Sequence, residues 1–323
     1  MYQMQKLYLS ILIVSVFTYS CKNRFDEVVT EFPAKDGSGL NIEKNASLTA
    51  RVHSNANQVL KFLRELDENP GYEYHNLSAS ENQLLKSYLE IMPPAYLDTM
   101  RQHLTGIYFV KDFVSSAYTE WFIKPDGKIY LIMVFNPELL KESLSEGLQR
   151  RAETVFKKGR IDFSIRFSKK GDTSRSLLFY LAHELTHAYD YIKGVSPYLD
   201  TEHQAFFKKP LESCPFAASA WKDIRKPLHP FENSDKISFY GFRKGPHLEA
   251  SDAVPLFEAL VVSDFVSLYA SQSWGEDIAE TFSYAYLSKR MGFEYSIKLH
   301  GRGVVHPLEN KKVIQRLKFL DNL

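Results

Sequence analysis

The chain has 323 residues, of which 44% are hydrophobic and 24% charged, a balance typical of a globular protein with one large domain or two small ones. The formal net charge is +1 and no long basic run is present, so nucleic-acid binding has no electrostatic support. The two cysteines, Cys21 and Cys214, are too few for a disulfide framework or a cysteine-rich zinc site. Any metal must therefore be bound by histidines and carboxylates.

The first twenty residues have the pattern of a secretory signal peptide. Lys6 is followed by an apolar stretch, residues 7–17, which is short for a membrane span, and small and polar residues then lead to Cys21. We expect a signal peptide over residues 1–20 and a lipid on Cys21, although Thr18 and Tyr19 depart from the usual lipobox. An uncleaved anchor, or a signal peptide followed by an incidental cysteine, is the alternative.

Residues 21–44 are polar and contain Gly37 and Gly39, which is typical of a linker, here one anchored by lipid. The protein would then be a cell-envelope lipoprotein, on the periplasmic face or the outer-membrane surface, attached to the membrane through its lipid. We expect it to be a monomer.

Residues 45–105 are expected to form a small helical N-terminal region. Apolar residues recur at helical spacing over residues 46–66, and Asn69-Pro70-Gly71 ends that segment. Two further helices are expected over residues 80–91 and 94–104.

From residue 106 the pattern changes to that of strands. Residues 106–111, 118–123 and 128–135 are β-like, and Pro125-Asp126-Gly127 predicts a hairpin turn between the last two. Asn136 and Pro137 then predict the start of a helix that runs to about residue 156, and residues 161–167 alternate as a strand with one buried face.

The rest of the chain is mainly helical in pattern. A long helix ends at Lys193 before Gly194, and residues 195–235 are irregular and rich in proline. A short strand is expected over residues 237–242, and helices over 254–262, 274–291 and 307–320. Strands followed by a long helix and further helices favour an α+β catalytic domain over residues 106–323.

The motif that indicates chemistry lies within that long helix, as His183-Glu184-Leu185-Thr186-His187. Histidines four residues apart lie one above the other on a helix, so both imidazoles can bind one ion. In such a motif the intervening glutamate borders the water on the metal rather than binding the metal. The alternative is two ordinary histidines beside a solvated glutamate.

A catalytic zinc site usually needs a third protein ligand. No further histidine follows His187 closely, so the third ligand is expected to be a glutamate from a later helix, with Glu276 the best candidate. Glu280 lies one turn further on, so one of the two could bind metal while the other accepts the N–H of a ligating histidine. Ser273 and Glu276 also fit a purely structural capping box. His203 and His247 are weaker candidate ligands.

These residues also resemble a known family. Tyr269, followed by Glu276-Asp277-Ile278-Ala279-Glu280-Thr281-Phe282, is similar to the second active-site segment of the gluzincin peptidases related to anthrax lethal factor and the Pro-Pro endopeptidases. The resemblance implies a zincin-like fold with a small mixed sheet and an active-site helix. It implies His183, His187 and Glu276 as Zn²⁺ ligands.

The resemblance also implies Glu184 as general base, Tyr269 as the hydroxyl that stabilises the oxyanion, and Glu280 as the carboxylate behind a ligating histidine. Positions 187 and 276 are 89 residues apart, longer than is usual in that family, so an insertion is expected at about residues 195–250.

Three functions stay open at this stage. The first is a secreted zinc metallopeptidase in which Glu184 takes the proton of a zinc-activated water that attacks a protein or peptide substrate. The second is a catalytically silent, zinc-binding surface lipoprotein that binds a partner. The third is a structural or carbohydrate-binding lipoprotein with a coincidental motif.

Overall fold

The computed structural model describes residues 24–42 and 46–320, and it confirms a mixed α+β architecture. The expected signal peptide and Cys21 lie outside the described residues. Among the helices described, none is long and apolar enough to cross a membrane. The α-helices are α1 (Arg24–Glu31), α2 (Asn57–Leu66), α3 (Ala79–Leu89), α4 (Pro94–His103), α5 (Leu144–Glu153), α6 (Leu177–Lys193), α7 (Thr201–Phe207), α8 (Pro215–Ala218), α9 (Ala253–Leu260), α10 (Trp274–Met291) and α11 (Lys311–Leu317).

Three sheets accompany these helices. The strands are β1 (Glu73–Tyr74), β2 (Leu104–Lys111), β3 (Ala117–Ile123), β4 (Ile129–Phe135), β5 (Phe163–Ser168), β6 (Trp221–Asp223), β7 (Lys226–Pro227), β8 (Glu294–Leu299) and β9 (Gly303–Val305). The largest sheet has the order β1-β2-β4-β3, in which β2 and β4 are parallel and the other pairs antiparallel. Strand β3 is therefore outermost in this sheet.

The large sheet is covered on both faces, which explains its unbroken apolar sequences. Ile107 and Phe109 of β2 belong to the main core with α6, whereas Tyr108 and Val110 pack toward α2 in a second, smaller core. Every residue of β4 is buried. A strand buried on both faces is hydrophobic throughout instead of alternating.

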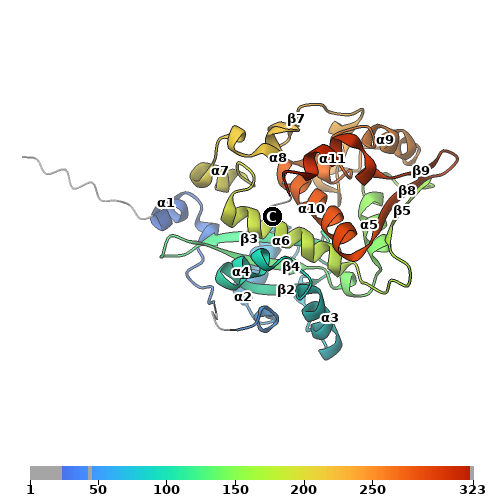
Figure 1. Ribbon diagram of the computed structural model, residues 1–323. Helices are drawn as coiled ribbons and strands as arrows, with labels where there is room; N and C mark the ends of the chain where they lie inside the picture. Colours follow the sequence, from blue (N-terminus) through green and yellow to red (C-terminus); the bar gives the residue numbers. More distant parts are fainter. Residues whose placement is uncertain (1–23, 43–45, 321–323) are drawn as a thin grey trace, which may run out of the picture.

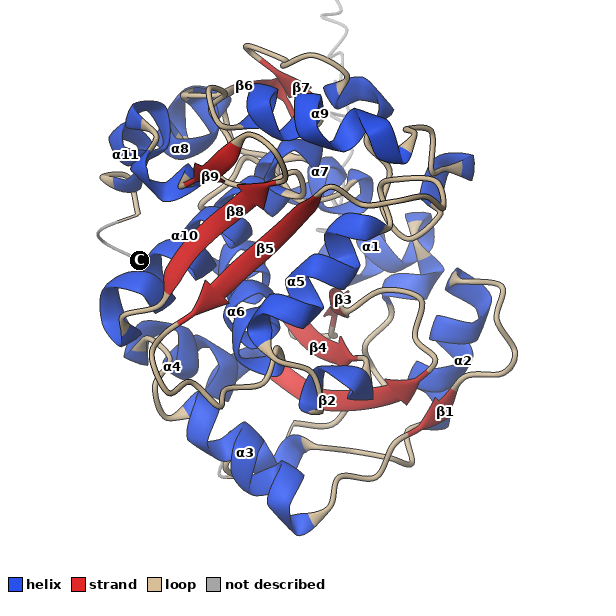
Figure 2. Cartoon of the chain, turned by 90° about the vertical axis from the view of Figure 1, so that its right-hand side faces the viewer, coloured by secondary structure: helices blue, strands red, loops and turns tan. Residues whose placement is uncertain are grey.

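Helix α6 runs through the middle of the molecule and positions the site. Strands β3 and β4 lie along one side of α6 and α10 packs along another (Figure 1). The β5-β8-β9 sheet lies on the α10 side, with α5 against β5 (Figure 2).

Several sequence predictions are confirmed. The β3–β4 hairpin closes through the expected turn, where Gly127 has a φ of 73° and donates its N–H to the carbonyl of Lys124 at 2.8 Å. Helix α6 ends at Gly194, and α10 covers the expected residues. Residues 45–105 contain α2, α3 and α4, and their side chains share both cores with the rest of the fold.

Other predictions are wrong. The helix expected over residues 136–156 is interrupted, because Ser143 forms a capping box with Glu146 and starts α5 anew. The helix expected over 46–66 is likewise a short 3₁₀ turn followed by α2, and residues 237–242 form no strand. The β8–β9 hairpin was not anticipated.

The segment expected as a linker, residues 21–44, is packed against the fold over its described part. It contains α1, whose Val28 is fully buried, and the backbone N–H of Gly37 donates to the carbonyl of Ile123 at 2.9 Å. Lys35 lies 2.6 Å from Glu120 on β3. Because the segment is mostly polar, its sequence did not predict these few contacts.

Candidate metal centre

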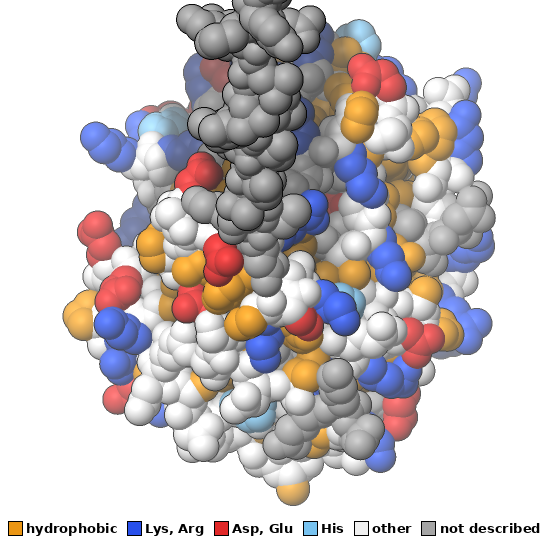
Figure 3. Space-filling model, turned by 90° about the vertical axis from the view of Figure 1, so that its left-hand side faces the viewer, with side chains coloured by type: hydrophobic (Ala, Val, Ile, Leu, Met, Phe, Trp, Pro, Cys, Tyr) orange, Lys and Arg blue, Asp and Glu red, His pale blue; other side chains and the backbone are white. Residues whose placement is uncertain are grey.

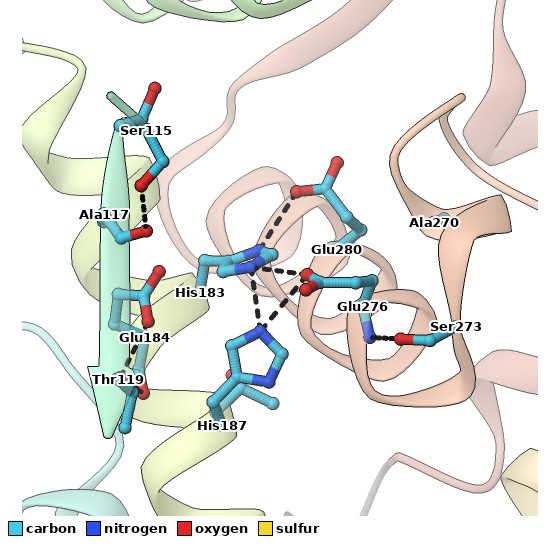
Figure 4. A network of polar contacts seen from close by, with 12 residues as sticks. Ser115, Ala117, Thr119, His183, Glu184, His187, Ala270, Ser273, Glu276 and Glu280 are labelled. Atoms are coloured by element: carbon cyan, nitrogen blue, oxygen red, sulfur yellow. Dashed lines mark hydrogen bonds and ion pairs between the residues drawn. The ribbon is translucent and has the colours of Figure 1, made fainter. Parts of the chain in front are cut away.

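Helix α6 carries both histidines of the motif. Leu178, Leu181 and Leu185 are buried in the main core and fix the rotation of the helix. His183 and His187 consequently lie on the side that faces α10, with ring centroids 4.7 Å apart. Figure 4 shows the two imidazoles pointing toward the same place as the carboxylate of Glu276.

The three side chains form a group with the geometry of a metal site. Nε2 of His183 lies 3.1 Å from Oε2 of Glu276, Nε2 of His187 lies 3.2 Å from the same oxygen, and the two nitrogens are 3.0 Å apart. Tetrahedral ligands at the bond lengths usual for zinc would be about 3.3 Å apart. The donor set therefore fits a small divalent ion, and the described residues bring together the three predicted ligands.

Glu276 reaches this group from the first turn of α10. Its N–H donates to Oγ of Ser273 at 3.2 Å, so Ser273 caps the helix, but its carboxylate faces the histidines instead of returning to the cap. Gly275 allows Leu199 to pack closely against the start of α10, since a Cβ at position 275 would lie 2.6 Å from the Leu199 side chain. The cap and the ligand are thus compatible functions of one short segment.

A buried ion-pair network lies behind His183. Its Nδ1 is 3.0 Å from Oε1 of Glu280, and Arg151 holds the same carboxylate with two hydrogen bonds of 2.9 and 2.7 Å. Ser267 donates to Glu280 at 2.7 Å. A proton on Nδ1 of His183 faces this carboxylate, which leaves the Nε2 lone pair free for a metal.

The electrostatics of the group favour a cation. Burial opposes ionisation of His183, but Glu276 and Glu280 outweigh it and raise the pKa of His183 to about 10. Burial likewise opposes ionisation of Glu276, and the charges and hydrogen bonds of the two histidines lower its pKa below the ordinary value. The site is therefore built for a positive charge between these three side chains.

Glu184 lies beside the group without belonging to it. Thr119 of β3 donates its hydroxyl to Oε2 of Glu184 at 2.7 Å, and Figure 4 shows this pair on the β3 side of the histidines. Burial raises the pKa of Glu184. A carboxylate with a raised pKa, held at the edge of a metal group, can accept and return a proton.

Tyr269 precedes α10 and lines the same cleft. Its ring centroid is 5.9 Å from that of His183, the guanidinium carbon of Arg151 lies 4.4 Å from the Tyr269 ring centroid, and Phe239 packs against the ring edge-on. Burial, followed by the charge of Glu276, raises the pKa of Tyr269 well above its ordinary value. The hydroxyl is consequently a proton-carrying hydrogen-bond donor at neutral pH.

His183, Glu184, His187, Tyr269 and Glu276 all line one cleft of about 750 Å³. Its walls include residues of α2, β3, α6, the start of α7, residues 238–243 and the start of α10, and Ala34 and Lys35 of the N-terminal segment also line it. The segment expected as an insertion, about residues 195–250, therefore contributes directly to the cleft. On the face in Figure 3, acidic, basic and apolar side chains are interspersed.

The other candidates lie elsewhere. His203 is buried beside Trp121 and Phe207, and His247 is exposed and contacts the carbonyl of Arg243 at 3.1 Å, so neither joins the metal group. Cys214 is buried and carries a free thiol. Sequence reasoning missed Arg151 and Thr119, which no local pattern distinguishes.

Comparison of the chain with protein-family models, with curated proteins and with solved structures found no match. The class of site therefore rests on its own geometry, a two-histidine, one-carboxylate group that could hold a metal ion.

Proposed function

We propose that this protein is a zinc-dependent metallopeptidase of the gluzincin type. The observation that carries the proposal is the separate carboxylate of Glu184, held by Thr119 beside a three-residue metal group within one cleft. Binding a metal for structure alone would need no such additional acid. The resemblance of residues 269–282 to gluzincin peptidases also supports the proposal.

The donor set supports zinc as the metal. Two imidazole nitrogens and one carboxylate oxygen are a common protein ligand set of catalytic zinc, with a further coordination position left for water or substrate. Zinc held there by His183, His187 and Glu276 would supply Lewis acidity to water and to the substrate carbonyl.

The chain's own residues would then divide the remaining chemistry. Glu184 takes the proton of the attacking water and delivers it to the leaving nitrogen as the amide bond breaks. The hydroxyl of Tyr269 donates a hydrogen bond to the carbonyl oxygen as that oxygen gains charge. Glu280 keeps the proton of His183 on Nδ1, so that the other nitrogen stays available as a ligand.

An extended polypeptide is the substrate that this cleft would suit. Residues 117–120 of β3 line the cleft, and β3 is the outermost strand of its sheet. An edge strand can add an extended peptide through main-chain hydrogen bonds, which bind without regard to side-chain identity.

We also propose that the protein is secreted through residues 1–20 and anchored by lipid on Cys21. Mass spectrometry of the N-terminal peptide from the native membrane fraction would detect a lipidated Cys21, and Cys21→Ala is expected to release the protein into the soluble fraction. An unmodified cysteine, with unchanged fractionation of the variant, would refute the anchor.

The main test combines metal analysis with cleavage of a proteome-derived peptide library. Wild type is expected to bind one zinc per chain and cleave, whereas Glu184→Gln should retain zinc and lose roughly 10²–10⁴-fold in rate. Stoichiometric zinc without cleavage, and partner binding unchanged in Glu184→Gln, would favour a silent zinc-binding lipoprotein. Purified protein without zinc, whose stability is unaffected by chelation, would refute both.

A further inference from the structure

The cationic side chains of the cleft, histidines apart, differ in whether they have partners. Lys35, Arg225 and Arg243 line the cleft. Lys35 is paired with Glu120 at 2.6 Å. Arg225 and Arg243 are exposed, and neither guanidinium forms an ion pair or hydrogen bond with any residue that the structure describes. The cleft therefore offers two uncompensated guanidinium groups.

Each arginine lies on a segment that packs against an element of the proposed active site. Arg225 lies between β6 and β7, and the carbonyl of the preceding Ile224 accepts the N–H of Trp274, the first residue of α10, at 3.1 Å. Glu276 follows two residues later. Arg243 follows a turn whose Phe239 packs edge-on against Tyr269, with centroids 4.8 Å apart. Both arginines therefore line the same cleft as the metal group, on segments that pack beside Tyr269 and the start of α10.

The turn that carries Arg243 is held in an unusual backbone conformation. Tyr240, Arg243 and Lys244 have φ values of 57°, 53° and 61°, which are uncommon for residues other than glycine. The hydroxyl of Tyr240 is 2.9 Å from Oγ of Ser116, and its N–H donates to Thr154 at 3.1 Å. Such strain persists only where surrounding contacts impose it, so the turn is a fixed wall of the cleft.

The two arginines also affect each other. Partial burial, followed by the charge of Arg225, lowers the pKa of Arg243 below its ordinary value. Like charges repel, so an anion that contacts both guanidinium groups would relieve the repulsion. A guanidinium presents its N–H groups as a planar fork that matches the two oxygens of a carboxylate.

Acidic side chains on another segment also line the cleft. Asp200 and Glu202 lie at the start of α7, and the pKa of Glu202 is raised by burial and by the neighbouring charge of Asp200. A substrate carboxylate would be repelled there and attracted to the arginines. The acidic residues at the start of α7 and the two arginines thus come from different segments of the cleft lining.

We propose that Arg225 and Arg243 form a carboxylate-binding subsite that selects substrates carrying an acidic group beside the scissile bond. The subsite rests on the proposed peptidase function for its effect on cleavage, but carboxylate binding in the cleft can be measured without any reaction. The carboxylate comes from an Asp or Glu side chain or from the C-terminus of a short peptide, and the experiment distinguishes these sources.

The experiment compares kcat/KM for matched peptides in zinc-loaded protein. One pair contains Glu or Gln at each position near the scissile bond, and a second pair has a free or an amidated C-terminus. Wild type is expected to prefer the carboxylate member of one pair by roughly tenfold, the effect of one charge-assisted contact at a partly exposed site.

Variants then assign that preference to the two arginines. Arg225→Ala with Arg243→Ala should reduce it to below about twofold, and Arg243→Glu should reverse it. Lys226→Ala and Lys244→Ala are matched controls, because both lysines are exposed neighbours outside the cleft lining. Equal cleavage of all peptides, or a preference that survives in the double variant, would overturn the subsite.

A separate binding measurement distinguishes this failure from failure of the peptidase proposal. Fluorescence anisotropy on Glu184→Gln measures the affinity for the same labelled peptides without turnover. Selective binding of the carboxylate peptides, abolished in the double arginine variant, would support the subsite even if no peptide is cleaved. Binding that ignores the carboxylate would reject the subsite whether or not cleavage occurs.

Discussion

Helix α10 carries two buried arginine–carboxylate pairs that are chemically alike and differ in what they contact. Glu280 pairs with Arg151 of α5, and Asp277 pairs with Arg316 of α11. All four side chains are at most 5% exposed. Glu280 also lies 3.0 Å from His183, whereas Asp277 accepts the indole N–H of Trp221 at 2.8 Å.

The difference in neighbours suggests a difference in function. The Glu280 pair is joined to the metal group, while the Asp277 pair joins the C-terminal helix and the β6–β7 hairpin to α10. Arg316 additionally donates to the carbonyl of Asp264 at 2.8 Å, which completes a structural junction. A buried ion pair is therefore weak evidence of function until the group beyond the carboxylate is known.

The largest expected effects come from neutralising each acid in turn. Glu280→Gln and Asp277→Asn keep the side-chain size but leave a buried arginine uncompensated, so each should lower the free energy of unfolding by about 3–5 kcal/mol. Only Glu280→Gln should also weaken zinc binding, by roughly 10- to 100-fold. Denaturant unfolding of the metal-free proteins and zinc titration measure the two effects. Equal weakening of zinc binding in both variants would erase the distinction between the pairs.

The second prediction concerns Tyr269. Its ring lies under Arg151, the partner of Glu280 in the pair next to the metal group. Tyr269→Phe removes only the hydroxyl, and loss of one such donor costs about 3 kcal/mol of barrier, or roughly 10²-fold in kcat. Tyr284→Phe is the matched control, since that ring is buried and stacks on Tyr295 with centroids 4.0 Å apart. An unchanged kcat in Tyr269→Phe would leave this tyrosine a core aromatic.

The same comparison explains which features could be predicted from the sequence. The metal group could be predicted because His183 and His187 are one helical turn apart, and because Glu276 and Glu280 repeat that spacing on a second helix. The β3–β4 hairpin could be predicted from its turn residues. Each of these signals is contained within a few consecutive residues.

The features that could not be predicted depend on contacts between distant residues. Arg151 lies 129 positions from Glu280, and Thr119 lies 65 positions from Glu184. An arginine in the last turn of a helix is expected from the helix dipole alone, so Arg151 gave no distinct signal. The packing of the N-terminal segment also could not be predicted, since only a few residues such as Val28 and Gly37 contact the fold within an otherwise polar stretch.

A third prediction concerns His203, which is buried without forming an ion pair among the described residues. It lies among Trp121, Tyr191 and Phe207, and burial lowers its pKa to about 4, a shift that Asp200 opposes and Lys35 and Lys209 reinforce. The unfolded chain takes up a proton near pH 6.5, whereas the folded chain does so only near pH 4. The contribution of His203 is therefore intact above pH 6.5 and is lost as the pH falls toward 4, by about 2 kcal/mol at pH 5.

The pH dependence of unfolding measures this contribution. Between pH 6.5 and 4, His203→Leu should reduce the slope of the free energy of unfolding against pH, because the unfolded chain no longer gains a proton at position 203. His229→Leu, at an exposed position, should leave the slope unchanged. A slope that persists in His203→Leu would assign the acid sensitivity to other groups.

The smallest expected effect concerns the N-terminus of α10, where the helix cap and the proposed metal ligand lie within four residues. Ser273 caps the helix, whereas Glu276 is one of the three residues of the metal group, so Ser273→Ala should cost about 1 kcal/mol of stability while zinc affinity changes little. Ser143→Ala at the start of α5, a cap remote from the cleft, should cost a similar amount. If Ser273→Ala instead weakens zinc binding by more than tenfold, the cap holds Glu276 in its ligand position, and stability and metal binding are not separable on α10.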